Sequence, residues 1–118
     1  LIGPSSILLA LMASGLNGQQ FSFHGYLSPK KELIGKDLKR LESQSRKDKG
    51  AHIFIETPYR NGQILDAVIQ HLSNPTLFCI AAGMHSPDAF IKTKSVGEWK
   101  KEKLPNIHKV PAVFIIQA

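Results

Sequence analysis

The sequence predicts an α/β fold, with a mixed sheet of about five strands flanked by about four helices. Short apolar or alternating runs, typical of strands, follow one another between segments whose apolar residues recur at helical spacing. The link between the predicted strands 76–82 and 89–95 is short, which favours an antiparallel pair and hence a mixed sheet. The 118 residues suit one domain, and the 42% hydrophobic content is enough for a buried core.

The first 50 residues predict two helices and one strand. Ser5 or Ser6 can cap a helix that Gly15 ends, and this helix is apolar almost all round. Residues 21–27 alternate like a strand. A second helix follows, with an inner stripe of leucine and isoleucine, an outer face of lysine, arginine and glutamate, and an exposed loop at 43–50 after it.

The second half of the chain predicts two helices and four strands. Residues 51–56 are apolar on both faces, as in a central strand. The helix that follows ends at Asn74-Pro75, and Ser95 and Glu98 form a capping box ahead of a short helix that holds Trp99. Three further runs are typical of strands: 76–82, 89–95 and 112–118.

Charge and cysteine content limit the classes of function. The net charge is +6, and lysines concentrate in 30–49 and 92–109, which is compatible with a phosphate-bearing partner or with two solvated surface elements. The single cysteine, Cys79, lies in an apolar run and predicts a buried thiol in a reducing compartment, the cytoplasm. No apolar run approaches the roughly 18 residues of a membrane span.

Common catalytic motifs are missing from the sequence. It contains no GxGxxG, P-loop or GxSxG pattern, and its five histidines have no metal-ligand spacing. A catalytic base is not identified. One stretch places polar residues at a strand end: in "HIFIETPYR", Glu56 and Arg60 bracket a Thr-Pro corner after a buried strand. Thr57 or Asn61 can cap the next helix, whereas Glu56 and Arg60 are either an ion pair or the edge of a site.

Three motifs in order, "GPSSILLALMASGL", "FSFHGYLSPK" and "HIFIETPYR", resemble the carboxyl-terminal domain of the tetrapyrrole methylase superfamily of S-adenosylmethionine-dependent methyltransferases. The nearest branch is the ribosomal RNA small-subunit methyltransferase I type. The resemblance implies a two-domain enzyme with the cofactor in the interdomain cleft. The chain, 1–118, is then the second domain, its partners being its own amino-terminal domain and a second copy in a homodimer.

The resemblance also assigns site residues. Arg60 and Tyr59 are assigned to the acceptor, and a tyrosine at 59, where the branch commonly has histidine, leaves the acceptor open between ribosomal RNA and a tetrapyrrole. The sequence at 82–84 also departs from that branch. The cofactor contacts it implies are Ser5, Ser6, the residue that ends the strand (Ile55 or Glu56), Ala82, Gly83, Met84, Pro111 and Ala112.

Methyl transfer from a sulfonium needs proximity, orientation and exclusion of water more than side-chain chemistry. The alternative hypothesis is a non-catalytic basic module that dimerises or binds nucleic acid.

Overall fold

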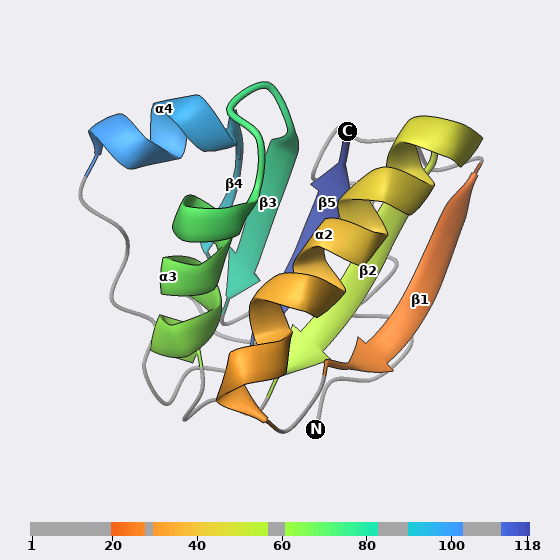
Figure 1. Ribbon diagram of the computed structural model, residues 1–118. Helices are drawn as coiled ribbons and strands as arrows, with labels where there is room; N and C mark the ends of the chain where they lie inside the picture. Colours follow the sequence, from red (N-terminus) through yellow and green to blue (C-terminus); the bar gives the residue numbers. More distant parts are fainter. Residues whose placement is uncertain (1–19, 28–29, 57–60, 83–89, 103–111) are drawn as a thin grey trace.

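The computed structural model describes residues 20–27, 30–56, 61–82, 90–102 and 112–118. Within these residues the chain forms one five-stranded sheet with three helices, which confirms the predicted α/β class (Figure 1). The fourth helix expected, after Ser5 and Ser6, lies outside the described residues. The elements are β1 Phe21–Tyr26, α2 Lys31–Asp48, β2 Ala51–Glu56, α3 Asn61–His71, β3 Leu77–Ala82, β4 Phe90–Ser95, α4 Val96–Lys101 and β5 Ala112–Gln117.

The sheet is mixed, with the strand order β1-β2-β5-β3-β4. β1 and β2 pair in parallel, whereas β5 lies antiparallel between β2 and β3. β3 and β4 form the predicted antiparallel pair, in register from Leu77 opposite Ser95 to Ala82 opposite Phe90. β1, β2 and β3 therefore all run in one direction, and their carboxyl ends lie at one edge of the sheet.

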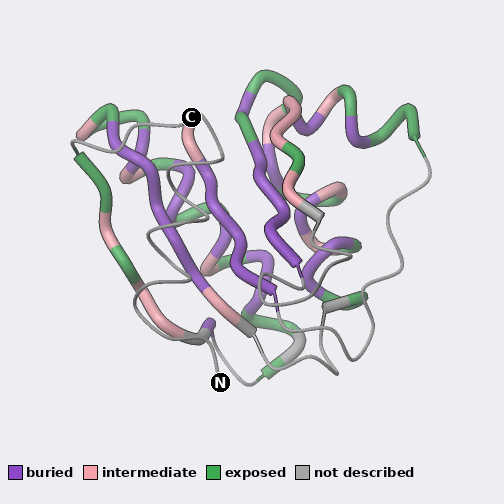
Figure 2. The backbone as a smooth tube through the Cα atoms, turned by 180° about the vertical axis from the view of Figure 1, so that it is seen from behind, coloured by how far each residue is buried: buried purple, intermediate pink, exposed green. Residues whose placement is uncertain are grey.

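Large side chains fill the space between the sheet and the helices α2 and α3, which lie on the same face (Figure 1). Phe114 of the central strand stacks on Phe54 and Phe78, with ring centroids 5.3 and 5.8 Å apart. Trp99 of α4 meets Phe78 edge-on and donates its indole N–H to the Phe78 carbonyl at 2.8 Å. Burial of each such ring stabilises the fold by about 1.5–3 kcal/mol. Figure 2 shows the resulting continuous buried path along β2, β3 and β5.

The other face of the sheet carries smaller side chains. Ala51, Ile53, Cys79, Ala81, Val113 and Ile115 form its fully buried cluster. Cys79 has no exposed surface, which confirms the buried thiol, and burial raises the pKa of that thiol, so it stays protonated and unreactive. None of the helices described is long and apolar enough to cross a membrane.

Helix α2 corrects two predictions. The segment 43–50 was expected to be an exposed loop, but the helix continues to Asp48 and ends at Lys49 in the left-handed conformation. Ser45 faces inward, where its hydroxyl donates to the Gly50 carbonyl at 2.6 Å and accepts from the Ala118 N–H at 2.8 Å. Glu42, expected on the outer face, is buried because donors from outside the helix surround it.

The capping box ahead of α4 is confirmed. The Ser95 hydroxyl accepts from the Glu98 N–H at 3.2 Å, and the Glu98 carboxylate accepts from the Ser95 N–H at 3.2 Å. The two bonds satisfy two main-chain donors at the helix start. The Ser95 N–H, and next the Ser95 hydroxyl, which also donates to the Glu98 carboxylate, hold the pKa of Glu98 below its usual value. The cap fixes the turn from β4 into α4 and so places Trp99 in the core.

Candidate functional site

Four of the predicted cofactor contacts meet at one edge of the sheet. Glu56 ends β2 and pairs with Ala112, the first residue of β5, which also pairs with Ala82 at the end of β3. Ile55 is one residue further in, opposite Val113. Three stretches that are far apart in the sequence thus place their assigned residues in one row across adjoining strands.

Strand β1 ends at the same edge. Its pairing with β2 shifts between Phe23 and Tyr26, and Tyr26 lies opposite Ile55. Gly25 in this irregular stretch has a φ of 71°, a conformation that residues with a Cβ rarely adopt. The bulge brings the end of β1 level with the end of β2, so the edge extends across all three parallel strands (Figure 1).

Two of the three residues in this row, Ala82 and Ala112, are small and apolar, and the third is Glu56. Ala82 and Ala112 are 2% and 1% exposed, and their side chains belong to the core under α2 and α3. Ile55 is half-buried against the opposite face. Ala82 and Ala112 therefore add no side-chain bulk beyond this edge. Two small side chains at these strand ends leave room for the flat face of a heterocycle.

The remaining predicted residues lie outside the described part of the chain. Glu56 itself is placed as the last residue of β2, but the Glu56–Arg60 ion pair and the helix cap at Thr57 are not tested. The predicted site residues outside the described ranges are Ser5, Ser6, Tyr59, Arg60, Gly83, Met84 and Pro111.

A polar cluster that the sequence did not predict lies between α2 and the first two strands, β1 and β2. The Nε2 atom of His52 is 3.0 Å from a carboxylate oxygen of Asp48, and its Nδ1 atom is 2.8 Å from Nε2 of His24. The two imidazole rings stack with their centroids 5.0 Å apart. His52 is 2% exposed, whereas His24 and Asp48 are partly exposed. A carboxylate and two imidazoles thus form one hydrogen-bonded chain.

Neighbouring groups shift the pKa values of His24 and Asp48, the two ends of this hydrogen-bonded series. Burial lowers the pKa of His24, and the neighbouring His52 and Arg40 charges lower it further, against the opposing effect of Asp48. The Gly50 N–H, which donates to Asp48 at 2.8 Å, is the main reason that the pKa of that carboxyl lies below its usual value. The Asp48 carboxylate can only accept, so His52 Nε2–H donates to it; in the neutral form of His52, Nδ1 then accepts from the Nε2–H of His24.

Sequence patterns point only weakly to this hydrogen-bonded series of Asp48, His52 and His24. Asp48 and His52 are four residues apart but lie in different elements, and His24 meets His52 only through the parallel pairing of β1 with β2. In the part of the chain that the structure describes, no group of three or more His, Cys, Asp or Glu side chains is arranged to hold a metal ion.

Comparison with known proteins gives relatives of one kind. The chain is 28% identical over 117 residues to the ribosomal RNA small subunit methyltransferase I of Buchnera aphidicola subsp. Schizaphis graminum (strain Sg), covering 97% of this chain and 40% of that protein. It is 40% identical over 70 residues to the protein of the same name from Mesorhizobium japonicum, covering 59% of this chain and 22% of that protein. These matches confirm the resemblance to the tetrapyrrole methylase superfamily. No family model matches the chain.

Two solved methyltransferase structures have a similar fold. The methyltransferase CobJ aligns with a TM-score of 0.57 and 20% identity, covering 93% of this chain and 46% of CobJ. The cobalamin biosynthetic enzyme cobalt precorrin-4 methyltransferase, CbiF, aligns with a TM-score of 0.57 and 14% identity, covering 95% of this chain and 48% of CbiF. At these identities the likeness shows the fold alone. The chain spans about 40% of the length of the Buchnera relative.

Proposed function

We propose that this chain forms one wall of the cofactor cleft of an S-adenosylmethionine-dependent methyltransferase. The observation that carries the proposal is the row Glu56–Ala112–Ala82 at the carboxyl-end edge of the sheet. The resemblance assigns these positions to cofactor contacts, and they come from three separate stretches of sequence. Ligands of open α/β sheets bind beyond the carboxyl ends of strands, which is the side on which this row lies.

The edge fits a nucleoside. Ala82 and Ala112 present no side chain beyond the edge because both are buried in the core. A flat ring can therefore approach the main chain, whose N–H and C=O groups bind and orient it, while the apolar surroundings exclude water. S-adenosylmethionine, when bound, supplies a methyl group already activated by its sulfonium. We assign positioning to this wall, and we name no residue as the base that accepts the proton of the methyl acceptor.

The rest of the cleft comes from a partner domain in this proposal. An amino-terminal domain faces the edge and supplies the remaining cofactor contacts, and the whole enzyme is a homodimer. The relatives of this chain are more than twice its length, which supports the assignment of this chain to one part of a larger enzyme.

Ribosomal RNA is the acceptor that we propose, with methylation at a 2′ hydroxyl. The matched relatives are named for small-subunit ribosomal RNA, and the net charge of +6 suits a polyanion. A tetrapyrrole is the second candidate, favoured by the fold that the chain shares with CbiF.

Calorimetry with S-adenosylmethionine on the full-length protein tests the cofactor proposal, and absence of binding overturns it.

Two alanines provide matched variants: Ala82 at the proposed cofactor edge and Ala51 at the opposite end of β2, both buried. Each change to valine overpacks the core and costs about 1–3 kcal/mol of stability. We expect Ala82→Val to weaken cofactor binding at least fivefold and Ala51→Val to change it less than twofold. Equal effects would remove the assignment of this edge.

A methyl map of small-subunit RNA tests the acceptor. RNA from a strain lacking the gene is expected to lose one 2′-O-methyl group, which the restored gene returns. An unchanged map would exclude the RNA acceptor and leave the tetrapyrrole candidate.

A further inference from the structure

We infer that the outer face of α2 binds the phosphate backbone of RNA through a row of cations, Lys36, Lys39, Arg40 and Lys47, here called the basic stripe. The inference rests on the ribosomal RNA form of the proposed function and adds to it the surface on which the RNA lies. This surface is separate from the cofactor edge.

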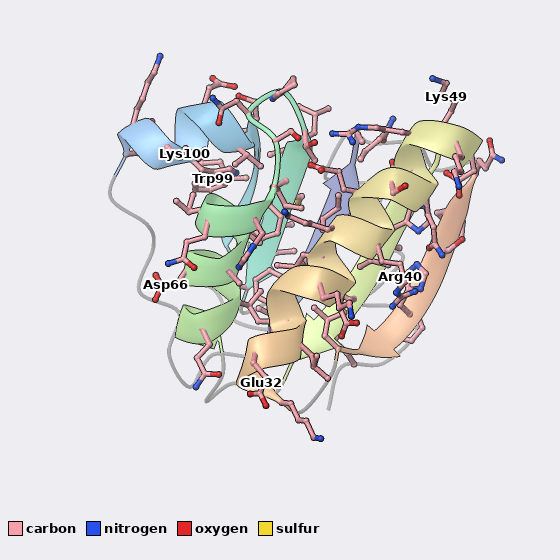
Figure 3. The ribbon with its side chains drawn as sticks, viewed as in Figure 1. Glu32, Arg40, Lys49, Asp66, Trp99 and Lys100 are labelled. Atoms are coloured by element: carbon pink, nitrogen blue, oxygen red, sulfur yellow. The ribbon has the colours of Figure 1, made fainter. Side chains whose placement is uncertain are left out.

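The geometry of α2 sets the direction of the stripe. Ile34, Leu38 and Leu41 are buried against the sheet, and a helix turns by 100° per residue. Lys36, Arg40 and Lys47 therefore project from the opposite side, and all the stripe residues are exposed. Figure 3 shows Arg40 on the side of α2 that faces away from α3. From Lys36 to Lys47 the stripe extends roughly 16 Å along the helix axis.

The positive charge of the stripe is largely uncompensated. Among the described residues, no carboxylate forms an ion pair with Lys36, Lys39 or Lys47. Asp37 reaches Arg40 only at 4.0 Å, at the limit of an ion pair. The other two acids in this part of the helix are occupied elsewhere: Glu42 is buried, and Asp48 accepts from Gly50 and His52.

The composition of the stripe favours a nucleic acid over a membrane or an acidic protein. A membrane-binding helix exposes its apolar face, whereas the apolar face of α2 is buried in the core. Protein interfaces rely on aromatic or large apolar anchors, and α2 exposes only Leu33, 36% exposed, ahead of the stripe. Exposed lysine and arginine side chains along one helix suit the phosphates of a nucleic acid, which they contact without reading base sequence.

The position of α2 relates the stripe to the cofactor edge. β1 and α2 are joined at the edge where Glu56, Ala82 and Ala112 lie, and the helix runs from there toward the other end of the strands (Figure 1). RNA bound along the stripe can therefore lie outside the cleft while one nucleotide reaches the edge. The stripe anchors the acceptor, and the cleft performs the reaction.

Two triple variants of the full-length protein test the inference. The first is Lys36→Gln, Lys39→Gln and Lys47→Gln on the stripe. The second, a control matched in residue type and net charge, is Lys92→Gln, Lys100→Gln and Lys101→Gln on β4 and α4. All three lysines are exposed and lie on the side of the molecule opposite β1, because β4 is the outermost strand there. Figure 3 labels Lys100 on α4. The measurement is the affinity for a fragment of small-subunit ribosomal RNA, as fluorescence anisotropy at several salt concentrations.

We expect the stripe variant to bind the RNA roughly thirtyfold more weakly, with the slope of log affinity against log salt reduced by about two. The control variant should retain wild-type affinity within about threefold. Equal losses in both variants, no loss in the stripe variant, or no RNA binding by the wild-type protein would each overturn the inference. Calorimetry with S-adenosylmethionine on the same samples confirms that each variant is folded. It also separates this failure from that of the proposed function, because an intact cofactor site does not require the stripe. If the triple variant fails to fold, the single variants Lys36→Gln and Lys47→Gln are compared with Lys101→Gln.

Discussion

Two carboxylates of helix α2, Glu42 and Asp48, have opposite surroundings. Glu42 is 4% exposed and accepts from the Thr76 hydroxyl at 2.6 Å and the Ser73 N–H at 2.8 Å, both in the link between α3 and β3. Asp48, whose side chain is 37% exposed, accepts from Gly50 and His52, which are its near neighbours in sequence. The Thr76 donor to Glu42 is 2% exposed, so water cannot replace it, whereas water can reach the partly exposed Asp48 carboxylate. Glu42 therefore links α2 to the segment between α3 and β3, whereas Asp48 raises the pKa of His24 against the larger lowering by burial.

Removal of Glu42 is expected to have the largest effect. Glu42→Ala leaves the buried Thr76 hydroxyl and the Ser73 N–H without their acceptor and opens a gap beneath α2. We expect it to lower the free energy of unfolding by about 3 kcal/mol, measured by urea denaturation. Glu32→Ala, at an exposed position of the same helix, is the control and should change stability by less than about 0.5 kcal/mol. Similar losses in both variants would contradict the anchoring role of Glu42.

A smaller effect is expected when only the charge of Glu42 is removed. Glu42→Gln keeps one acceptor oxygen for Thr76 but loses the ion pair with Arg46, whose guanidinium lies 3.2 Å from the carboxylate and is itself exposed. The expected loss is about 1 kcal/mol in the same urea experiment. A loss as large as that of Glu42→Ala would mean that charge, and not the hydrogen bonds, is the main contribution of this residue.

The contrast between Glu42 and Asp48 also shows what the sequence could and could not predict. Alternation, helical spacing and the Ser95–Glu98 cap are local patterns, and the strands and helices that they predict within the described residues are confirmed. Glu42 was assigned to the solvent face because its neighbours are charged, yet its partners Ser73 and Thr76 lie 31 and 34 residues away. Ser45 misled the prediction in the same way, because its partners Gly50 and Ala118 become neighbours only in the folded chain.

The candidate site likewise has a part that local sequence could assign and a part that depends on the fold. The resemblance assigned Glu56, Ala82 and Ala112 individually, and only the strand order brings them into one row. That order could not be predicted, because β5 comes last in the sequence but pairs between β2 and β3. The contact between His24 and His52 likewise depends on a parallel pairing of strands that are 28 residues apart.

The pH dependence of stability provides the next test. The pKa of His24 is lowered in the folded protein, so below the unfolded value of about 6.5 the unfolded chain binds more protons. Stability is therefore complete above that pH and falls as the pH drops through the unfolded and then the folded pKa of His24. Urea denaturation at pH 7.5 and 5.5 should show a loss for the wild type that is smaller in His24→Gln. Equal losses in both proteins would assign the pH dependence to other groups.

Titration of the His24 ring is the most sensitive test of the role of Asp48, although it involves the smallest change in stability. The negative charge of Asp48 raises the pKa of His24, and the positive charge of Arg40 lowers it. Asp48→Asn keeps an oxygen that accepts from Gly50 and His52 but removes the charge, so the His24 pKa should fall. Arg40→Gln should raise it. The two shifts, measured by NMR from the ring protons, have opposite signs, and a general loosening of the fold would instead move both values toward 6.5. A rise of the His24 pKa in Asp48→Asn would contradict this expectation. It would show that the variant loosens the contact and relieves the desolvation of His24, which raises the pKa by more than the lost charge lowers it.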